Sequence, residues 1–144
     1  MLYTPQVLAL AMGLARWPLG EDLPLVGEAR SASCGSRLRV GLALDAAGGI
    51  ARIGLSAQAC AVGQAAAHVM AQAATGRTAA DMIRAEHDIA AWLEQGAPMP
   101  DWPGLSDLAP VRDYPGRHGA FMLGWRAALA ALGAPLVLSG AVRA

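Results

Sequence analysis

Two alternating stretches on either side of a short glycine-containing turn constrain the fold of this chain most strongly. In residues 38–44 and in residues 51–57, aliphatic side chains alternate with arginine, glycine or small residues, as expected of half-buried strands. The connection at residues 46–49 reads Ala-Ala-Gly-Gly and permits the positive φ angles of tight hairpins. The sequence therefore predicts an antiparallel hairpin whose buried face consists of Leu38, Val40, Leu42 and Leu44 in the first strand and Ala51, Ile53, Leu55 and Ala57 in the second.

The only two cysteines of the chain, Cys34 and Cys60, flank this hairpin. If the turn is centred near Ala47 and Gly48, the numbers of paired residues add up to about 95, and those of the two cysteines add up to nearly the same value. We therefore expect the two thiols to be approximate cross-strand neighbours at the open end of the hairpin.

The remaining elements predict an α+β fold, with a small antiparallel sheet of about three strands and helices packed on one face. A possible edge strand covers residues 25–30, and Thr4 and Pro5 mark the start of a helix that ends near residue 15. A second helix is expected over residues 60–75, before the glycine at position 76. At 144 residues the chain is long enough for one domain. We assign residues 1–133 to that domain and residues 134–144 to a C-terminal tail.

Three further helical segments are expected in the second half of the chain. Thr78 and Asp81 resemble a capping box that starts a helix ending near Gly96. Residues 105–111 are a short helical candidate, and Pro115 opens a last long helix that ends near Leu132.

Charge and hydropathy exclude several functional classes. All 11 basic residues are arginines, and 11 acidic residues balance them, so no general attraction for nucleic acid or anionic lipid is expected. The apolar run at residues 7–15 is too short to span a bilayer and has no preceding Lys or Arg. We therefore predict a cytoplasmic protein that binds neither nucleic acid nor membranes.

Cys60 is expected near the N-terminus of a helix, where backbone N–H groups and the helix dipole favour a thiolate. A thiolate is the form of cysteine that binds metal or attacks sulfur. Two alternatives remain open from the residues alone: Cys60 is a small buried hydrophobic residue, or it forms a structural disulfide with Cys34.

Three segments resemble the U-type iron-sulfur cluster assembly scaffold family, which includes IscU, SufU and the NifU N-terminal domain. Residues 31–37, Ser-Ala-Ser-Cys-Gly-Ser-Arg, resemble the family segment N-P-x-C-G-D, and residues 58–65, Gln-Ala-Cys-Ala-Val-Gly-Gln-Ala, resemble G-C-x-x-S-x-A-S. Residues 111–125 resemble V-R-x-F-P-x-R-x-x-C-x-x-L-x-W. The resemblance implies a SufE/NifU-like fold and a role in iron-sulfur cluster assembly.

The chain departs from the family at two ligand positions. The resemblance implies three cysteines and an aspartate around zinc or a nascent cluster, but Ser36 stands at the aspartate position and Ala120 at the third cysteine position. His118 is the candidate replacement, because imidazole is a suitable ligand beside two thiolates. Cys34, Cys60 and His118 would form a three-ligand site for zinc, iron or an iron-sulfur cluster, with an open fourth position. The alternative is that His118 only caps its helix or faces solvent.

Other polar residues receive smaller roles. His68 lies too far along its predicted helix to share the site and is expected in the core or on the surface, and His87 is expected on a solvated helix face. Arginines near the thiols supply positive charge that can support the site or hold an acidic partner segment. The supporting residues are Ser36, Arg37 and Arg117, with Arg39 and Arg112 nearby. Ordinary surface arginines are the alternative.

No motif of an enzyme active site occurs in the sequence, so three functions remain open. The first is a scaffold that binds iron, zinc or a nascent cluster, with a cysteine desulfurase and iron-sulfur acceptor proteins as partners by resemblance. The second is persulfide relay from that desulfurase without stable metal binding. The third is a metal-free docking protein of the same fold.

Overall fold

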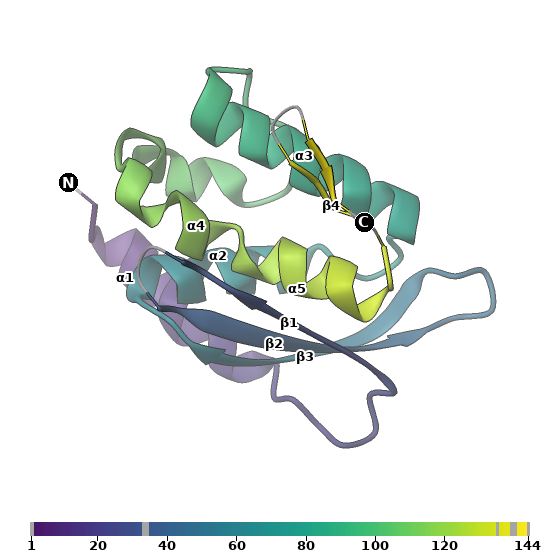
Figure 1. Cartoon of the computed structure of the whole chain (residues 1–144). Coiled ribbons are helices and arrows are strands. Elements are labelled where there is room, and N and C mark those ends of the chain that lie inside the picture. The colour runs from purple at the N-terminus through teal and green to yellow at the C-terminus, as the bar shows by residue number, and fades with distance from the viewer. Residues whose placement is uncertain (1, 33–34, 135, 139–140, 144) are drawn as a thin grey trace.

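The predicted hairpin is present in the structure, a computed structural model that describes residues 2–32, 35–134, 136–138 and 141–143 (Figure 1). Strand β2 (Arg37–Leu44) pairs antiparallel with strand β3 (Ile50–Gln58), from Arg37 opposite Gln58 to Ala43 opposite Arg52. These pairs have the predicted register, which is therefore confirmed along most of the hairpin.

The predicted buried face is wrong at the turn end of the hairpin. The register shifts between Ala43 and Leu44, so that Leu44 pairs with Ile50. Such an irregularity reverses the faces to which the following side chains point. The extra residue is Ala51 in β3, which is exposed, and Ile50 is fully buried in its place. Leu44, opposite Ile50 at the end of β2, is also exposed. The turn itself contains Gly48 at a φ of 86°, which is the conformation that a glycine permits most easily.

The sheet has three strands, because β1 (Leu25–Arg30) adds to β2 as an antiparallel edge strand. Helices cover one face of the sheet, here called the inner face (Figure 1). The α+β class, the three-stranded sheet and its one-sided helical cover are all confirmed.

The first helix has its predicted N-cap, but both N-terminal helices are shorter than predicted, and the second has Ala73 and not Gly76 as its C-cap. Helix α1 (Pro5–Met12) starts after Thr4, whose hydroxyl accepts a hydrogen bond from the Val7 amide at 3.0 Å. It continues as the 3₁₀ helix η1 (Gly13–Arg16) instead of remaining α-helical to residue 15. Helix α2 (Ala61–Gln72) has Cys60 as its N-cap and ends three residues before the predicted end.

Helix α3 (Ala79–Gln95) has the predicted boundaries. The Thr78 hydroxyl accepts from the Asp81 amide, and the Asp81 carboxylate accepts from the Thr78 amide, so the capping box is confirmed. Gly96 closes the helix in the left-handed conformation.

The last long helix is divided into three pieces, contrary to prediction. The 3₁₀ helix η2 (Leu105–Asp113) covers the short helical candidate, and η3 (Pro115–Arg117), α4 (His118–Phe121) and α5 (Leu123–Ala131) follow it. Gly116 lies in η3 and Gly119 lies in α4. The low helix propensity of these two glycines weakens a continuous helix through this region.

The core lies between the sheet and helices α2 and α5. Trp125 is fully buried at its centre, stacked on Phe121 with ring centroids 5.8 Å apart and edge-on to Trp102 at 5.6 Å. Helix α5 approaches β1 closely, because Gly27 has no side chain at the point where the backbone of Ala131 passes. The close approach of α5 to β1 therefore requires a glycine at this position.

The segment before β1 covers half of the opposite, outer face of the sheet. The amide of Leu55 donates to the carbonyl of Trp17 at 2.7 Å, which fixes this segment at the edge of β3. Leu19 and Leu23 then lie against Gly41 and Gly54, where side chains on the strands would collide with them. The other half of the outer face, toward the start of β2, carries charged side chains.

The predicted C-terminal tail contains a second, small ladder. Strand β4 (Leu136–Leu138) pairs antiparallel with β5 (Ala141–Arg143). Among the helices in the described ranges, none has the length and apolar character needed to cross a membrane.

Candidate functional site

Cys60 lies at the joint between β3 and α2, at the end of the sheet where β2 begins. It is half-buried and is the N-cap of α2, and its side chain makes no capping hydrogen bond to the first turn. The side-chain amide of Gln64 donates to the Ala59 carbonyl at 2.9 Å and so ties the first turn of the helix to the joint. The thiol is thus held on a fixed turn at the N-terminal end of a helix.

The loop between β1 and β2 lies at the same end of the sheet, because Arg37 at the start of β2 pairs with Gln58 at the end of β3. Two backbone hydrogen bonds hold this loop: the Ser31 amide donates to the Ser36 carbonyl at 2.8 Å, and the Gly35 amide donates to the Ser31 carbonyl at 3.1 Å. Cys34 belongs to this loop but lies outside the described residues. Its pairing with Cys60 therefore stays a prediction.

His118 is the first residue of α4 and is buried, with 7% of its surface exposed. Its Nε2 atom lies 2.9 Å from the carbonyl oxygen of Arg112. A carbonyl can only accept a hydrogen bond, so Nε2 carries a proton and Nδ1 is the ring nitrogen that can offer a lone pair. Metal-bound imidazoles have the same arrangement, in which the second ring nitrogen donates to a carbonyl and fixes the ring.

Helix α4 lies directly against the first turn of α2. A Cβ atom added to Gly63 would be 3.3 Å from the carbonyl oxygen of Ala120 and 3.6 Å from its Cβ. Gly63 is one turn beyond Cys60, and Ala120 is two residues beyond His118. The fold therefore brings the turn that carries Cys60 next to the short helix that carries His118. Ala120 itself is fully buried and has no donor atom.

The candidate supporting residues surround this region at different depths. Ser36 is buried just before β2, and Arg37 is exposed, with its Nε atom donating to the side chain of Gln58 at 2.7 Å. Arg117 is half-buried immediately before His118, and Arg112 is exposed. Within the ranges that the structure describes, no group of three His, Cys, Asp or Glu residues is arranged to hold a metal, and Cys34 is outside those ranges.

The two other histidines lie away from the site. His68 is buried in α2, and the core was one of the two locations expected for it. Its Nδ1 atom accepts a hydrogen bond from the indole N–H of Trp17 at 3.0 Å. Burial lowers the pKa of His68, and the nearby charge of Arg16 lowers it further. His87 is exposed on α3, as predicted. Sequence alone could not show that the carbonyl of Arg112 fixes His118, because a backbone acceptor leaves no signal in residue types.

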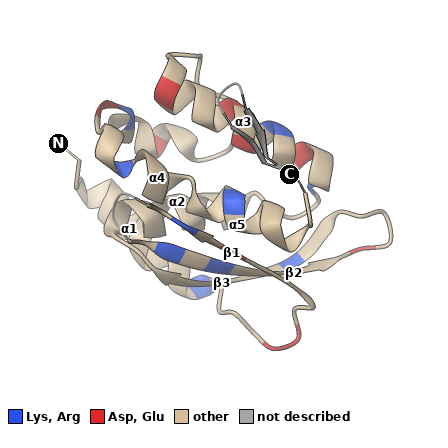
Figure 2. Ribbon diagram, in the orientation of Figure 1, with Lys and Arg blue, Asp and Glu red and all other residues tan. Residues whose placement is uncertain are grey.

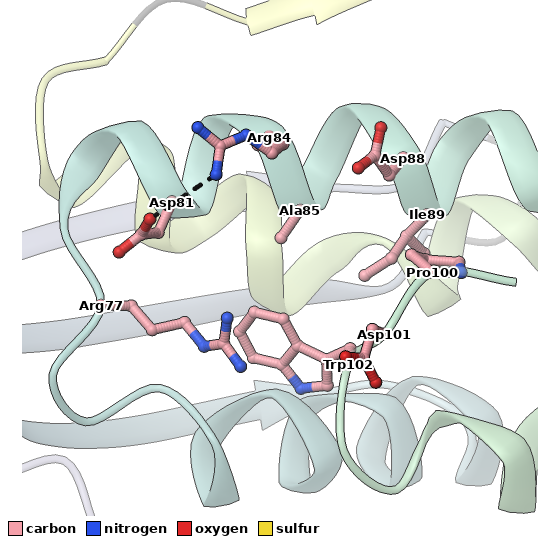
Figure 3. Close-up of a pocket in the computed structure, with 9 residues that line it drawn as sticks. All are labelled: Arg77, Asp81, Arg84, Ala85, Asp88, Ile89, Pro100, Asp101 and Trp102. Carbon is pink, nitrogen blue, oxygen red and sulfur yellow. Dashed lines mark ion pairs between the residues drawn. The ribbon is translucent and has the colours of Figure 1, made fainter.

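A separate hollow of about 250 Å³ lies between α3 and the segment before η2 (Figure 3). The guanidinium of Arg77 stacks over the Trp102 ring there, 4.0 Å from its centroid, and Arg84 forms an ion pair at 3.9 Å with Asp81, one turn earlier on α3. None of the predicted site residues lines this hollow, so it is distinct from the thiol region.

Comparisons with known proteins agree with the fold. A NifU-like protein (N-terminal) from Brucella abortus is 29% identical, with a TM-score of 0.81 and 92% of each chain covered. A structure described as a putative iron-sulfur cluster assembly scaffold protein for the SUF system, from Fervidobacterium islandicum AW-1, shares the fold. It is 21% identical, with a TM-score of 0.80 over 91% of this chain and 97% of that one. No curated protein sequence matches this chain. The family model described as the NifU-like N terminal domain matches residues 17–119, and the chain therefore belongs to that family, the predicted U-type scaffold family of iron-sulfur cluster assembly.

Proposed function

We propose that this chain is a scaffold that holds iron, zinc or a nascent iron-sulfur cluster with Cys34, Cys60 and His118. The observation that carries the proposal is the geometry of His118. Its Nε2–H donates to the Arg112 carbonyl, so Nδ1 is the atom left to coordinate, and α4 packs beside the turn of Cys60. A buried imidazole fixed in this way keeps one ring nitrogen available for a metal.

The proposed donor set fits a thiophilic metal. Two thiolates and one imidazole suit zinc or iron, and three protein donors leave a fourth position open. Ala120 offers no ligand, so sulfide, water or a partner's side chain would occupy that position. Arg37 and Arg117 would support the site by offsetting the negative charge of two thiolates.

The iron and sulfide are cargo in this proposal. A cysteine desulfurase would supply sulfur at the open position, and an iron-sulfur acceptor protein would take the product. Because Cys60 is only half-buried, its sulfur can be reached by such partners.

Persulfide relay is a second candidate, favoured by the buried methyl group of Ala120 where a third thiolate would be expected. In this reaction the Cys60 thiolate attacks the outer sulfur of a desulfurase persulfide. A new sulfur-sulfur bond forms on Cys60, and the desulfurase cysteine leaves as a thiolate. The relay requires an accessible thiolate and no imidazole ligand.

Metal and acid-labile sulfide analysis of the anaerobically purified chain tests the proposal. The scaffold function predicts about one metal or one cluster per chain, and a large loss of that metal in Cys34→Ala and in His118→Gln. Glutamine at position 118 can still donate to the Arg112 carbonyl, so this variant removes the ligand and keeps the hydrogen bond. His87→Gln is the matched control, since His87 is exposed and distant, and it should bind metal as the natural chain does.

Two results would overturn the scaffold function. If the chain is metal-free and Cys60 becomes persulfidated by a desulfurase, relay replaces it. If the chain neither binds metal nor accepts sulfur, the metal-free docking function replaces both.

A further inference from the structure

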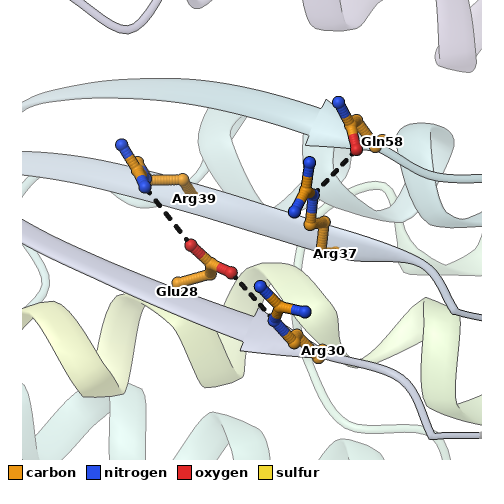
Figure 4. Close-up of polar contacts among 5 residues, drawn as sticks. All are labelled: Glu28, Arg30, Arg37, Arg39 and Gln58. Atoms are coloured by element: carbon orange, nitrogen blue, oxygen red, sulfur yellow. Dashed lines mark hydrogen bonds and ion pairs between the residues drawn. The ribbon is translucent and has the colours of Figure 1, made fainter.

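The open half of the outer sheet face carries three arginines close to the end where Cys60 lies. Arg30 of β1 and Arg37 and Arg39 of β2 point to this side, together with one carboxylate, Glu28 (Figure 4). Figure 2 shows basic residues along these strands. Asp22, in the segment that crosses the outer face, pairs with Arg52 farther along the sheet. The excess of positive charge is therefore concentrated at the end nearest the thiol region.

The arrangement of these charges is unfavourable for an isolated sheet. Arg30 and Arg37 are directly opposite each other on neighbouring antiparallel strands. Like charges in this position repel and destabilise strand pairing. Glu28 partly offsets the repulsion, because it forms ion pairs with Arg30 at 3.1 Å and with Arg39 at 3.4 Å. Its pKa is lowered, chiefly by the hydrogen bond from Arg30.

One carboxylate leaves much of the hydrogen-bonding capacity of the three guanidinium groups for a ligand. In the described part of the chain, Arg30 and Arg37 each donate through Nε and Arg39 donates through one terminal nitrogen. A guanidinium has five N–H donors, so each retains donors that face solvent. The Arg30 and Arg39 side chains are 68% and 56% exposed.

Two of the arginines also line a hollow that a ligand could enter. Its volume is about 200 Å³, and its polar lining consists of Arg37, Arg39, Glu28, Ser56 and Gln58, with Leu19 and Leu38 as apolar walls. Ser56 is the cross-strand partner of Arg39, and Gln58 is the partner of Arg37. The hollow thus combines two cations, one carboxylate that is already paired with Arg39, two neutral polar groups and an aliphatic surface.

We propose that this surface, Arg30, Arg37 and Arg39 with the adjoining hollow, docks an extended acidic segment of a partner protein. Arg37 and Arg39 are two residues apart on one strand, about 7 Å along it. Carboxylates on alternate residues of an extended peptide have the same spacing, so each can meet one guanidinium. A partner bound here would lie beside the joint that carries Cys60. The proposal does not depend on metal binding at that site.

The test uses the full chain and a blocked, fluorescently labelled peptide in which glutamate alternates with threonine. Fluorescence anisotropy at low ionic strength measures binding, and salt should weaken it. Each of Arg37→Gln and Arg39→Gln should reduce affinity about two- to fivefold, and the double variant about tenfold. Arg84→Gln is the matched control, because Arg84 is exposed on α3 away from the sheet, and it should bind as the natural chain does.

Several outcomes would overturn the proposal. A glutamine-threonine peptide that binds equally well would show that charge is not recognised. Unchanged binding by the double variant, with its fold verified by circular dichroism, would show that the surface is not the docking site. Displacement of the peptide by inorganic phosphate alone would indicate a small-anion site, and tighter binding of a single-stranded oligonucleotide would indicate nucleic acid.

Discussion

Replacing Gly27 with alanine should separate α5 from the sheet. A Cβ atom at this position would lie 2.2 Å from the Ala131 amide nitrogen and 2.4 Å from the Ala127 carbonyl oxygen, both of them backbone atoms. Neither can move unless the helix moves. Overpacking of this kind costs about 1–3 kcal/mol, and contact with a rigid backbone places Gly27→Ala at the upper end. Alanine in a strand recovers about 0.5–1 kcal/mol relative to glycine.

The expected net loss is therefore about 2 kcal/mol, or roughly 4–8 °C in Tm for a chain of this size. Urea denaturation and differential scanning calorimetry measure both quantities. Gly116→Ala is the control, because nothing lies within 4 Å of an added Cβ there and its φ is not positive. If Gly27→Ala were as stable as the natural chain, the close packing of α5 on β1 would be refuted.

Two further predictions concern buried polar groups. Arg126→Met should destabilise the fold by about 3 kcal/mol in urea denaturation, because Glu86, with 2% of its side chain exposed, would lose its partner at 3.1 Å. The double variant Glu86→Leu/Arg126→Met should recover most of that loss, and a double variant less stable than the single one would contradict this. Acid should weaken the fold through His68: its folded pKa is lowered by burial, so the unfolded chain binds more protons and stability falls as the pH drops below about 6.5. The Tm of His68→Leu should depend less on pH over that range than the natural Tm, and equal slopes would exclude this role.

Much of the fold could be predicted because local patterns agree with tertiary contacts. Alternation and the glycine turn gave the hairpin register, and the pair Thr78 and Asp81 gave the start of α3. The irregularity beside Leu44 was missed because alternation assumes unbroken pairing. The division of the last helix was missed because Pro115 marks a helical start and carries no information on where α-helical geometry fails.

The candidate site was predictable only in part. Cys60 at a helix N-cap follows from the strand-to-helix transition, and its position is confirmed. The burial of His118 depends on packing of α4 against α2 through Gly63, which joins residues far apart in the sequence. Arg37 and Arg39 were predicted to share one side of the hairpin, but the opposition of Arg30 and Arg37 required the register of β1.

X-ray absorption spectroscopy at the zinc edge of the zinc-loaded chain tests the central claim most directly. Coordination by Cys34, Cys60 and His118 predicts two sulfur atoms at about 2.3 Å and at least one nitrogen at about 2.0 Å. The nitrogen contribution should disappear in His118→Gln and persist in His87→Gln. A zinc environment of oxygen and nitrogen alone, or a spectrum unchanged by His118→Gln, would contradict the proposed site.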